Sequence, residues 1–163
     1  QCPYSRKSVS TLERLAKDFG DQVHILFHHS PLNFHRNAMP AAIAAECAGK
    51  QGQFKAYSDL LFNTPRLTEE GFLETSESLQ LDAESFITCY LNKQTQQAIE
   101  KHLDVLDELG APGTPSFFIN GKRILGAKPY EHFKQTVEEA LANVRASGLT
   151  GPEYYNQNVM KAQ

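Results

Sequence analysis

The chain has 163 residues, enough for one well-packed domain with an insertion. Its formal net charge is -3 at pH 7, so composition gives no sign of the basic surface that nucleic-acid binding requires. No apolar run approaches the roughly 20 residues of a membrane-spanning helix.

The first expected element is a helix that begins directly after Cys2. Pro3 suits the first helical position, because the N–H that proline lacks would have no partner there. Apolar residues then recur at three- and four-residue steps as far as Phe19, and Gly20 follows as a C-terminal cap. Cys2 therefore lies at a helix N-terminus, where the unpaired N–H groups and the helix dipole favour a thiolate. This position makes Cys2 a candidate nucleophile, the alternative being an ordinary thiol near a frayed end.

Residues 23–27 form a short apolar run between turn signals, and this pattern predicts a buried strand. Four histidines lie in or beside the run: His24, His28, His29 and His35. Imidazoles are common ligands of zinc and copper, but no two of these stand at helical spacing with a carboxylate partner. No metal site is predicted, and the histidines are interpreted as polar residues that close the strand.

The pattern is helical throughout residues 36–110. Pro40 begins an alanine-rich helix, and Thr68 and Asp82 are each followed by acidic residues, as N-caps of two further helices. The last helix of the set ends at Gly110.

Three cysteines cannot all pair within one chain. If Cys2 is the reactive one, Cys47 and Cys89 remain, each on a helix face that is expected to be buried. They form either a disulfide, which would suit an oxidising compartment, or two buried free thiols.

Residues 111–115 contain two prolines and a glycine, and they turn the chain sharply. Residues 116–119 and 122–125 are then expected to pair as a hairpin, because Asn120-Gly121 is a strong two-residue turn.

Pro129 begins a final amphipathic helix that ends near Gly148. The remaining residues, 149–163, are expected to form one short helix or the start of a linker into a longer chain.

Three stretches taken together resemble the DsbA family of bacterial thiol-disulfide oxidoreductases. They are residues 2–5 (Cys-Pro-Tyr-Ser), 41–49 (Ala-Ala-Ile-Ala-Ala-Glu-Cys-Ala-Gly) and 113–121 (Gly-Thr-Pro-Ser-Phe-Phe-Ile-Asn-Gly). The resemblance implies an α/β protein with a thioredoxin-like fold and an inserted all-helical domain. Residues 1–35 and 111–148 would form the thioredoxin-like domain, residues 36–110 the insertion, and residues 149–163 a tail or linker.

The resemblance also implies roles for individual residues. The catalytic motif would consist of Cys2, Pro3, Tyr4 and Ser5, with Cys2 as the attacking thiol. Thr114 and Pro115 would form the substrate-facing loop, joined by a cis peptide bond. Arg6 and Lys7, in the first turns of the helix, are expected to add positive potential near the thiol.

The sequence departs from the family in two places. Ser5 stands where the family has its second active-site cysteine, which indicates either a trapping variant or a natural monothiol enzyme that uses an external thiol. The family also has a β-strand before the active-site helix, whereas only Gln1 precedes Cys2 here. We therefore expect an unfilled strand position in the sheet.

The predicted function is thiol-disulfide exchange on protein or peptide substrates, in the periplasm or another extracytoplasmic compartment. No cofactor is expected, and the partners would be substrates with thiols or disulfides and a redox partner protein or external thiol. Two alternatives remain open at this point. One is a glutathione-dependent transferase or isomerase of the same fold, and the other is a peptide-binding module without turnover, in which Cys2 would keep an ordinary pKa.

Overall fold

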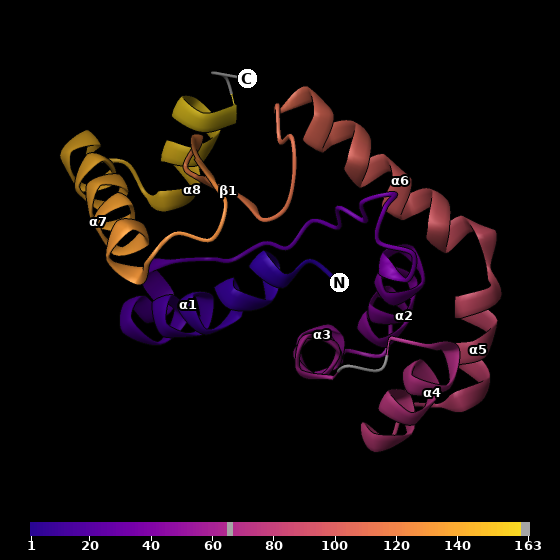
Figure 1. The fold of residues 1–163 in the computed structure, drawn as a ribbon. Coiled ribbons are helices and arrows are strands. Elements are labelled where there is room, and N and C mark those ends of the chain that lie inside the picture. Colours follow the sequence, from indigo (N-terminus) through magenta and orange to yellow (C-terminus); the bar gives the residue numbers. More distant parts are fainter. Residues whose placement is uncertain (65–66, 161–163) are drawn as a thin grey trace.

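Helices make up most of the computed structural model, which describes residues 1–64 and 67–160 (Figure 1). The helices are α1 (Pro3–Phe19), α2 (Ala38–Gly49), α3 (Phe54–Asn63), α4 (Glu69–Ser78), α5 (Ala83–Leu91), α6 (Lys93–Glu108), α7 (Tyr130–Ser147) and α8 (Gly151–Tyr154). A 3-10 turn, η1 (Gly20–Gln22), follows α1, and a π-helical turn, η2 (Tyr155–Val159), follows α8. Two strands, β1 (Ser116–Ile119) and β2 (Lys122–Leu125), form the sheet that the described residues contain. Within those residues no helix has the length and apolar character needed to cross a bilayer.

The first helix begins and ends at the predicted residues, Pro3 and Phe19. Gly20 caps it with φ of +49°, a conformation that favours glycine, and its N–H donates to the carbonyl of Ala16. Since α1 carries Cys2 at its start, this helix sets the position of the candidate nucleophile.

Helices α2 to α6 pack around one buried core. Its most buried members are Ala44, Cys47, Ala48, Tyr57, Phe86 and Ile99. Two predicted N-caps are confirmed: the side chain of Thr68 accepts from the Gly71 N–H, and that of Asp82 accepts from the Ser85 N–H. The helix predicted to begin at Pro40 begins two residues earlier, at Ala38, which places the proline in the first turn.

A disulfide joins Cys47 on α2 to Cys89 on α5, with the two Cα atoms 5.7 Å apart. This confirms the pairing that the sequence left open between a disulfide and two free thiols. Cys2 is the one free cysteine of the chain.

Tyr57 carries a fully buried hydroxyl in this helical core. The hydroxyl donates to the backbone carbonyl of Phe72 over 2.7 Å, and burial raises the pKa of the phenol. We expect Tyr57→Phe to lower the free energy of unfolding by about 1 kcal/mol, because the buried hydrogen bond to the Phe72 carbonyl is lost. Urea unfolding followed by circular dichroism measures this. Tyr155→Phe, which removes the hydroxyl of a 42% exposed ring, is the control and should have little effect; an equal loss in both variants would contradict the argument.

The hairpin forms as predicted, with antiparallel pairing from Ser116 opposite Leu125 to Ile119 opposite Lys122. Asn120 and Gly121 have φ of +46° and +86°, as a two-residue hairpin turn of this kind requires.

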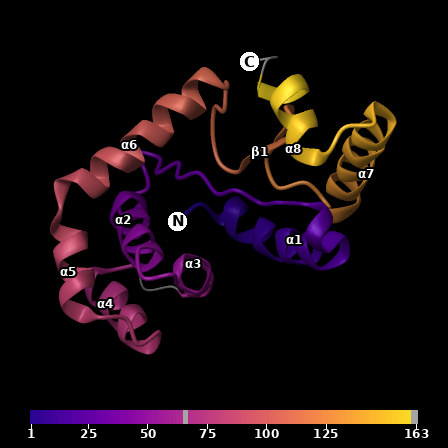
Figure 2. The same ribbon diagram turned by 180° about the vertical axis from the view of Figure 1, so that it is seen from behind.

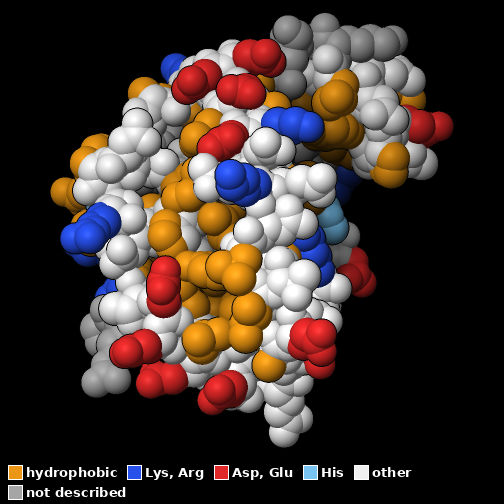
Figure 3. Space-filling model, turned by 90° about the vertical axis from the view of Figure 1, so that its right-hand side faces the viewer, with side chains coloured by type: hydrophobic (Ala, Val, Ile, Leu, Met, Phe, Trp, Pro, Cys, Tyr) orange, Lys and Arg blue, Asp and Glu red, His pale blue; other side chains and the backbone are white. Residues whose placement is uncertain are grey.

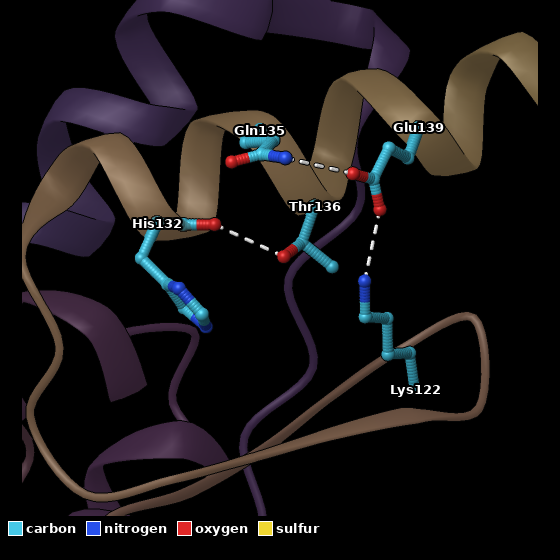
Figure 4. A network of polar contacts seen from close by, with 5 residues as sticks. All are labelled: Lys122, His132, Gln135, Thr136 and Glu139. Carbon is cyan, nitrogen blue, oxygen red and sulfur yellow. Dashed lines mark hydrogen bonds and ion pairs between the residues drawn. The ribbon is translucent and has the colours of Figure 1, made fainter.

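Polar contacts tie the hairpin to α7 (Figure 4). Lys122, on β2, donates to one carboxylate oxygen of Glu139 over 2.8 Å, and Gln135 donates to the other over 3.0 Å. One turn away, the Thr136 hydroxyl donates to the His132 carbonyl. The Lys122–Glu139 pair joins β2 to α7, and the other two contacts lie within α7.

A second buried core lies between α1, α7 and the hairpin. Its buried members are Leu15, Phe19, Ile124, Phe133 and Val137. The helical core and this core lie in different parts of the structure (Figures 1 and 2). The residue boundaries proposed above for the two domains stay a prediction.

The strand predicted at residues 23–27 is not formed. The segment is extended but makes no ladder with any described residue, and Ile25, Leu26 and Phe27 are 47%, 68% and 48% exposed. Only Val23 packs against the second core. The physical reason is the absence of a neighbour, since an extended chain becomes a strand only when another strand supplies its hydrogen bonds. The unpaired segment agrees with the unfilled strand position that the sequence predicted.

Helix α7 begins after Pro129 and is capped by Gly148 with φ of +69°. The segment that follows contains the expected short helix, α8, extended by the turn η2. Val159 in this turn is buried and approaches Gly121 of the hairpin. The end of the predicted tail, residues 161–163, lies outside the described residues.

On the face formed by α4, α5 and α6, apolar side chains gather between charged ones (Figure 3). The large apolar side chains that these helices expose are Leu73, Ile87, Leu91 and Val105.

Candidate functional site

Cys2 is the N-cap of α1, with extended backbone angles of φ -62° and ψ 121°. Pro3 occupies the first helical position, and the Arg6 N–H closes the first turn on the Cys2 carbonyl at 3.1 Å. The thiol is only partly buried, so part of its surface is open to solvent. The sequence fixes this arrangement locally, because proline at the helix start leaves the cysteine outside the first turn.

The thiol meets the loop that precedes β1. Cys2 Sγ donates to the Thr114 carbonyl at 3.3 Å, a contact between residues 112 apart in the chain. The Thr114–Pro115 peptide bond is cis, as the family resemblance implied. The loop is anchored at its end, where the Gly126 N–H donates to the Pro115 carbonyl over 2.9 Å. The structure thus brings together the two stretches that the sequence marked as site residues.

A shallow pocket of about 200 Å³ opens beside this contact. It is lined by residues 112–116 of the loop and by Leu125 and Gly126 of the hairpin. Thr114 both lines the pocket and contacts Cys2, so this one residue connects the pocket to the thiol.

The pKa of Cys2 is lowered from the ordinary value of a thiol. Burial acts in the opposite direction and is the largest single influence, but hydrogen bonds from Thr114, from the backbone and hydroxyl of Ser5, and from the backbone of Tyr4 together outweigh it. Apart from this effect on the Cys2 sulfur, the buried Thr114 hydroxyl has no hydrogen-bond partner among the described residues. Ser5 thus stabilises the charged sulfur although it cannot form a disulfide with it.

Arg6 and Lys7, which were expected to add positive potential near the thiol, make their contacts elsewhere. Arg6 donates to the backbone carbonyl of Thr64, and Lys7 lies over the ring of Tyr4 at 5.8 Å. Both side chains have partners other than the sulfur, so short-range hydrogen bonds, rather than these two cations, account for the low pKa of Cys2.

We expect Thr114→Val to raise the pKa of Cys2, because valine keeps the shape of the side chain but removes the hydroxyl that the thiolate uses. The ultraviolet absorbance of the thiolate, followed against pH, measures the midpoint. Thr11→Val, further along α1, is the matched control and should leave the titration unchanged. An unshifted midpoint in the Thr114 variant would show that the helix terminus and Ser5 alone set the pKa.

The histidines predicted to close a strand instead divide between two environments. His28 and His29 approach His102 of α6, whereas His24 is exposed and the ring of His35 meets that of Phe34. Sequence reasoning did not anticipate this cluster, because His102 lies 73 residues from His29 in the chain. Within residues 1–64 and 67–160, no group of histidine, cysteine and acidic side chains has a geometry that could hold a metal ion.

Solved structures with the same fold include proteins from three bacteria. A periplasmic thioredoxin-like protein from Salmonella enterica serovar Typhimurium matches with a TM-score of 0.75 and 22% identity, over 86% of this chain and 79% of that one. A thioredoxin-like oxidoreductase from Silicibacter pomeroyi matches with a TM-score of 0.77 and 24% identity, over 85% and 80%. Proteus mirabilis ScsC matches with a TM-score of 0.75 and 23% identity, over 88% and 79%. At these identities the likeness establishes the fold.

The similar curated sequences are Na(+)/H(+) antiporters. That of Salinispora arenicola, NhaA 1, is 33% identical over 147 residues, which are 89% of this chain and 22% of the antiporter. NhaA 3 of Salinispora tropica is 32% identical over 155 residues, 94% of this chain and 24% of the antiporter. The chain therefore spans about a quarter or less of the length of these relatives.

A family description covers most of the chain. It is that of thioredoxin, and it matches residues 1–139. The chain belongs to the thioredoxin family, in a form with an inserted helical domain.

Proposed function

We propose that this chain carries out thiol-disulfide exchange on protein or peptide substrates, with Cys2 as the nucleophile. The observation that carries the proposal is a partly exposed thiol at a helix N-terminus, in contact with Thr114 of the loop before β1. The lowered pKa of this thiol supports it. A thiol whose pKa is lowered ionises more readily than an ordinary one, and this thiol is partly open to solvent, so it is suited to attack a disulfide.

The reaction begins with attack of the Cys2 thiolate on one sulfur of a substrate disulfide. A bond forms between Cys2 and that sulfur, and the substrate disulfide breaks, so that the other sulfur leaves as a thiolate. The product is a mixed disulfide between Cys2 and the substrate. The overall count of disulfides is unchanged at this step.

Ser5 determines what happens next. It lies in the first turn of α1, where a dithiol enzyme of this family has the cysteine that attacks the mixed disulfide. A hydroxyl cannot make that attack, so release requires an external thiolate, which takes the substrate sulfur into a new disulfide and regenerates the Cys2 thiolate. The proposed activity is therefore that of a monothiol exchanger, dependent on an external thiol or a redox partner protein.

The pocket beside Thr114 and Pro115 is the proposed site for the substrate chain. It is small and open, which suits the few residues that flank a disulfide better than a whole small molecule enclosed on all sides. Pro3 and Tyr4 would form the opposite wall, since Tyr4 is 59% exposed next to the thiol.

An extracytoplasmic location is part of the proposal. The Cys47–Cys89 disulfide supports it, because structural disulfides persist in oxidising compartments. The antiporter relatives suggest that such a unit can be carried beside a membrane transporter. For this chain we propose thiol exchange rather than ion movement, since the matched family is that of thioredoxin.

The test is the formation of a covalent adduct. Protein with its Cys47–Cys89 disulfide intact is incubated at neutral pH with a disulfide-bearing peptide and analysed by mass. One peptide half should be added to the protein, and none to the Cys2→Ala variant. Failure to form the adduct at neutral pH would rule the proposal out. A parallel measurement of glutathione binding separates it from the glutathione-dependent alternative, and an ordinary pKa of Cys2 would favour the binding module.

A further inference from the structure

The extended segment between α1 and α2 is held to the helical part of the molecule at His29. This side chain is 5% exposed, and its Nε2–H donates to Oε1 of Glu46 on α2 over 2.9 Å. Its backbone N–H donates to Nδ1 of His102 on α6 over 3.4 Å. One residue of the segment is thus bonded to two different helices, α2 through its side chain and α6 through its backbone.

The second of these bonds restricts the protonation state of His102. An imidazole nitrogen accepts a hydrogen bond only when it carries no proton, so Nδ1 must be free and His102 neutral. The ring of His102 is also stacked on that of His29, with centroids 5.8 Å apart and planes within 9°. The ring of His28 meets it edge-on at 5.3 Å. A proton on His102 would remove the acceptor and place a cation between two other imidazoles.

We propose that His28, His29, Glu46 and His102 form an acid-sensitive latch. At neutral pH the latch holds the segment that joins α1 to α2 against α2 and α6, and protonation of His102 releases it.

The groups around His102 and Glu46 determine the direction in which the pKa of each is shifted. Burial is the main cause that lowers the pKa of His102, His29 and His28 lower it further, and Glu46 partly opposes them. The hydrogen bond from His29 is the main cause that lowers the pKa of Glu46; burial opposes it, and the charges of His29, His102 and Lys50 assist. The ring that α3 contributes to the cluster is that of Phe54, which is apolar and packs against His29 at 5.7 Å.

The direction of the pH dependence follows from these shifts in pKa. A histidine whose pKa is lower when latched than when released binds its proton more weakly in the latched state. Its contribution to the stability of the latched state is therefore complete above the ordinary histidine pKa of about 6.5 and declines as the pH falls below that pKa. The Glu46 carboxylate, whose pKa is also lowered, keeps its contribution until the pH falls through its own lower pKa. As the pH falls, the contribution of His102 is therefore lost before that of Glu46, in mildly acidic solution.

The segment held by the latch also contacts the candidate active site. The held segment continues to Asn37, whose backbone N–H donates to the side-chain Oε1 of Gln1 over 2.7 Å, next to Cys2. Release of the segment at His29 would therefore loosen a contact that borders the nucleophile.

Amide hydrogen exchange of residues 24–32, measured from pH about 7.5 to about 5 and corrected for the intrinsic pH dependence of exchange, tests the proposal. Opening linked to one proton should make protection fall by up to about tenfold per pH unit below the ordinary histidine pKa. His102→Asn, whose side-chain oxygen can accept in place of Nδ1 but does not titrate, should make protection independent of pH. His24→Asn, at an exposed histidine of the same segment, is the matched control and should behave as the wild type.

Protection in the wild type that does not change with pH would overturn the proposal, as would an unchanged pH dependence in His102→Asn. If that variant fails to fold, the ring titration of His102 in the unaltered protein, followed by NMR, replaces it. The midpoint of the ring titration should then lie below the ordinary histidine pKa of about 6.5, and protection at the His29 amide should fall between that value and the midpoint. A ring midpoint at or above the ordinary value, or a loss of protection outside this range, would refute the latch. None of these outcomes depends on the activity of Cys2.

Discussion

Replacement of both Cys47 and Cys89 by alanine is expected to lower the free energy of unfolding by about 4 kcal/mol, on the chain-entropy model. The disulfide closes a loop of 42 residues and joins α2 to α5 across the helical core, where Cys47 is 1% exposed. Without the bridge, the unfolded chain regains the freedom that the closed loop denies it. Urea unfolding of the two proteins, with circular dichroism as the signal, measures the difference.

Cys2→Ala is the control for that experiment, because it removes a cysteine that bridges nothing and should leave the unfolding curve in place. Wild-type protein unfolded in excess reductant should match the double variant. A loss well below 1 kcal/mol would mean that α2 and α5 already associate in the unfolded state, so that the bridge restricts little.

The second large effect is expected from Ser5→Cys, which should convert a protein that accumulates a mixed disulfide into one that turns over. Ser5 is three residues from Cys2 at the start of α1, so the new thiol lies on the same side of the helix as the attacking sulfur. It can attack the mixed disulfide, form an internal disulfide with Cys2 and release the substrate as a thiol. Because oriented intramolecular attack corresponds to a very high effective concentration, we expect release at least about 10²-fold faster than with millimolar external thiol.

The lifetime of the peptide adduct, followed by mass after rapid quenching, provides the measurement. Ser10→Cys, which introduces an exposed thiol on the same helix beyond reach of Cys2, is the matched control and should leave the adduct long-lived. Equal lifetimes for the wild type and the Ser5 variant would show that the first turn of α1 does not present position 5 to the bound substrate.

The elements that sequence reasoning located correctly are those whose causes are local. Pro3 and Gly20 bound α1, Thr68 and Asp82 cap their helices through their own side chains, and the turn at residues 120–121 requires the two positive φ angles it has. Each of these depends on residues within four positions, which a single sequence displays.

Other features depend on residues that are distant in the chain, and there the sequence was insufficient. Composition could not decide between a disulfide and two free thiols, since this depends on how α2 packs on α5. The segment 23–27 has the composition of a buried strand but lacks the neighbour that would bury it. The contact between Cys2 and Thr114 was anticipated only through the family resemblance, which carries three-dimensional information that residue patterns do not.

The same exposed segment also bears on how the molecule behaves at high concentration. Residues 25–27 offer apolar side chains beside backbone groups that make no hydrogen bond to the described residues, and β1 has a strand neighbour on one side only. An extended, apolar and unpaired stretch is a template for strand exchange between copies, and the net charge of -3 provides little mutual repulsion to prevent it. Colloidal stability would then be limited by this one stretch. The substitution Leu26→Lys, at the most exposed of the three residues, would improve it by placing a charge there.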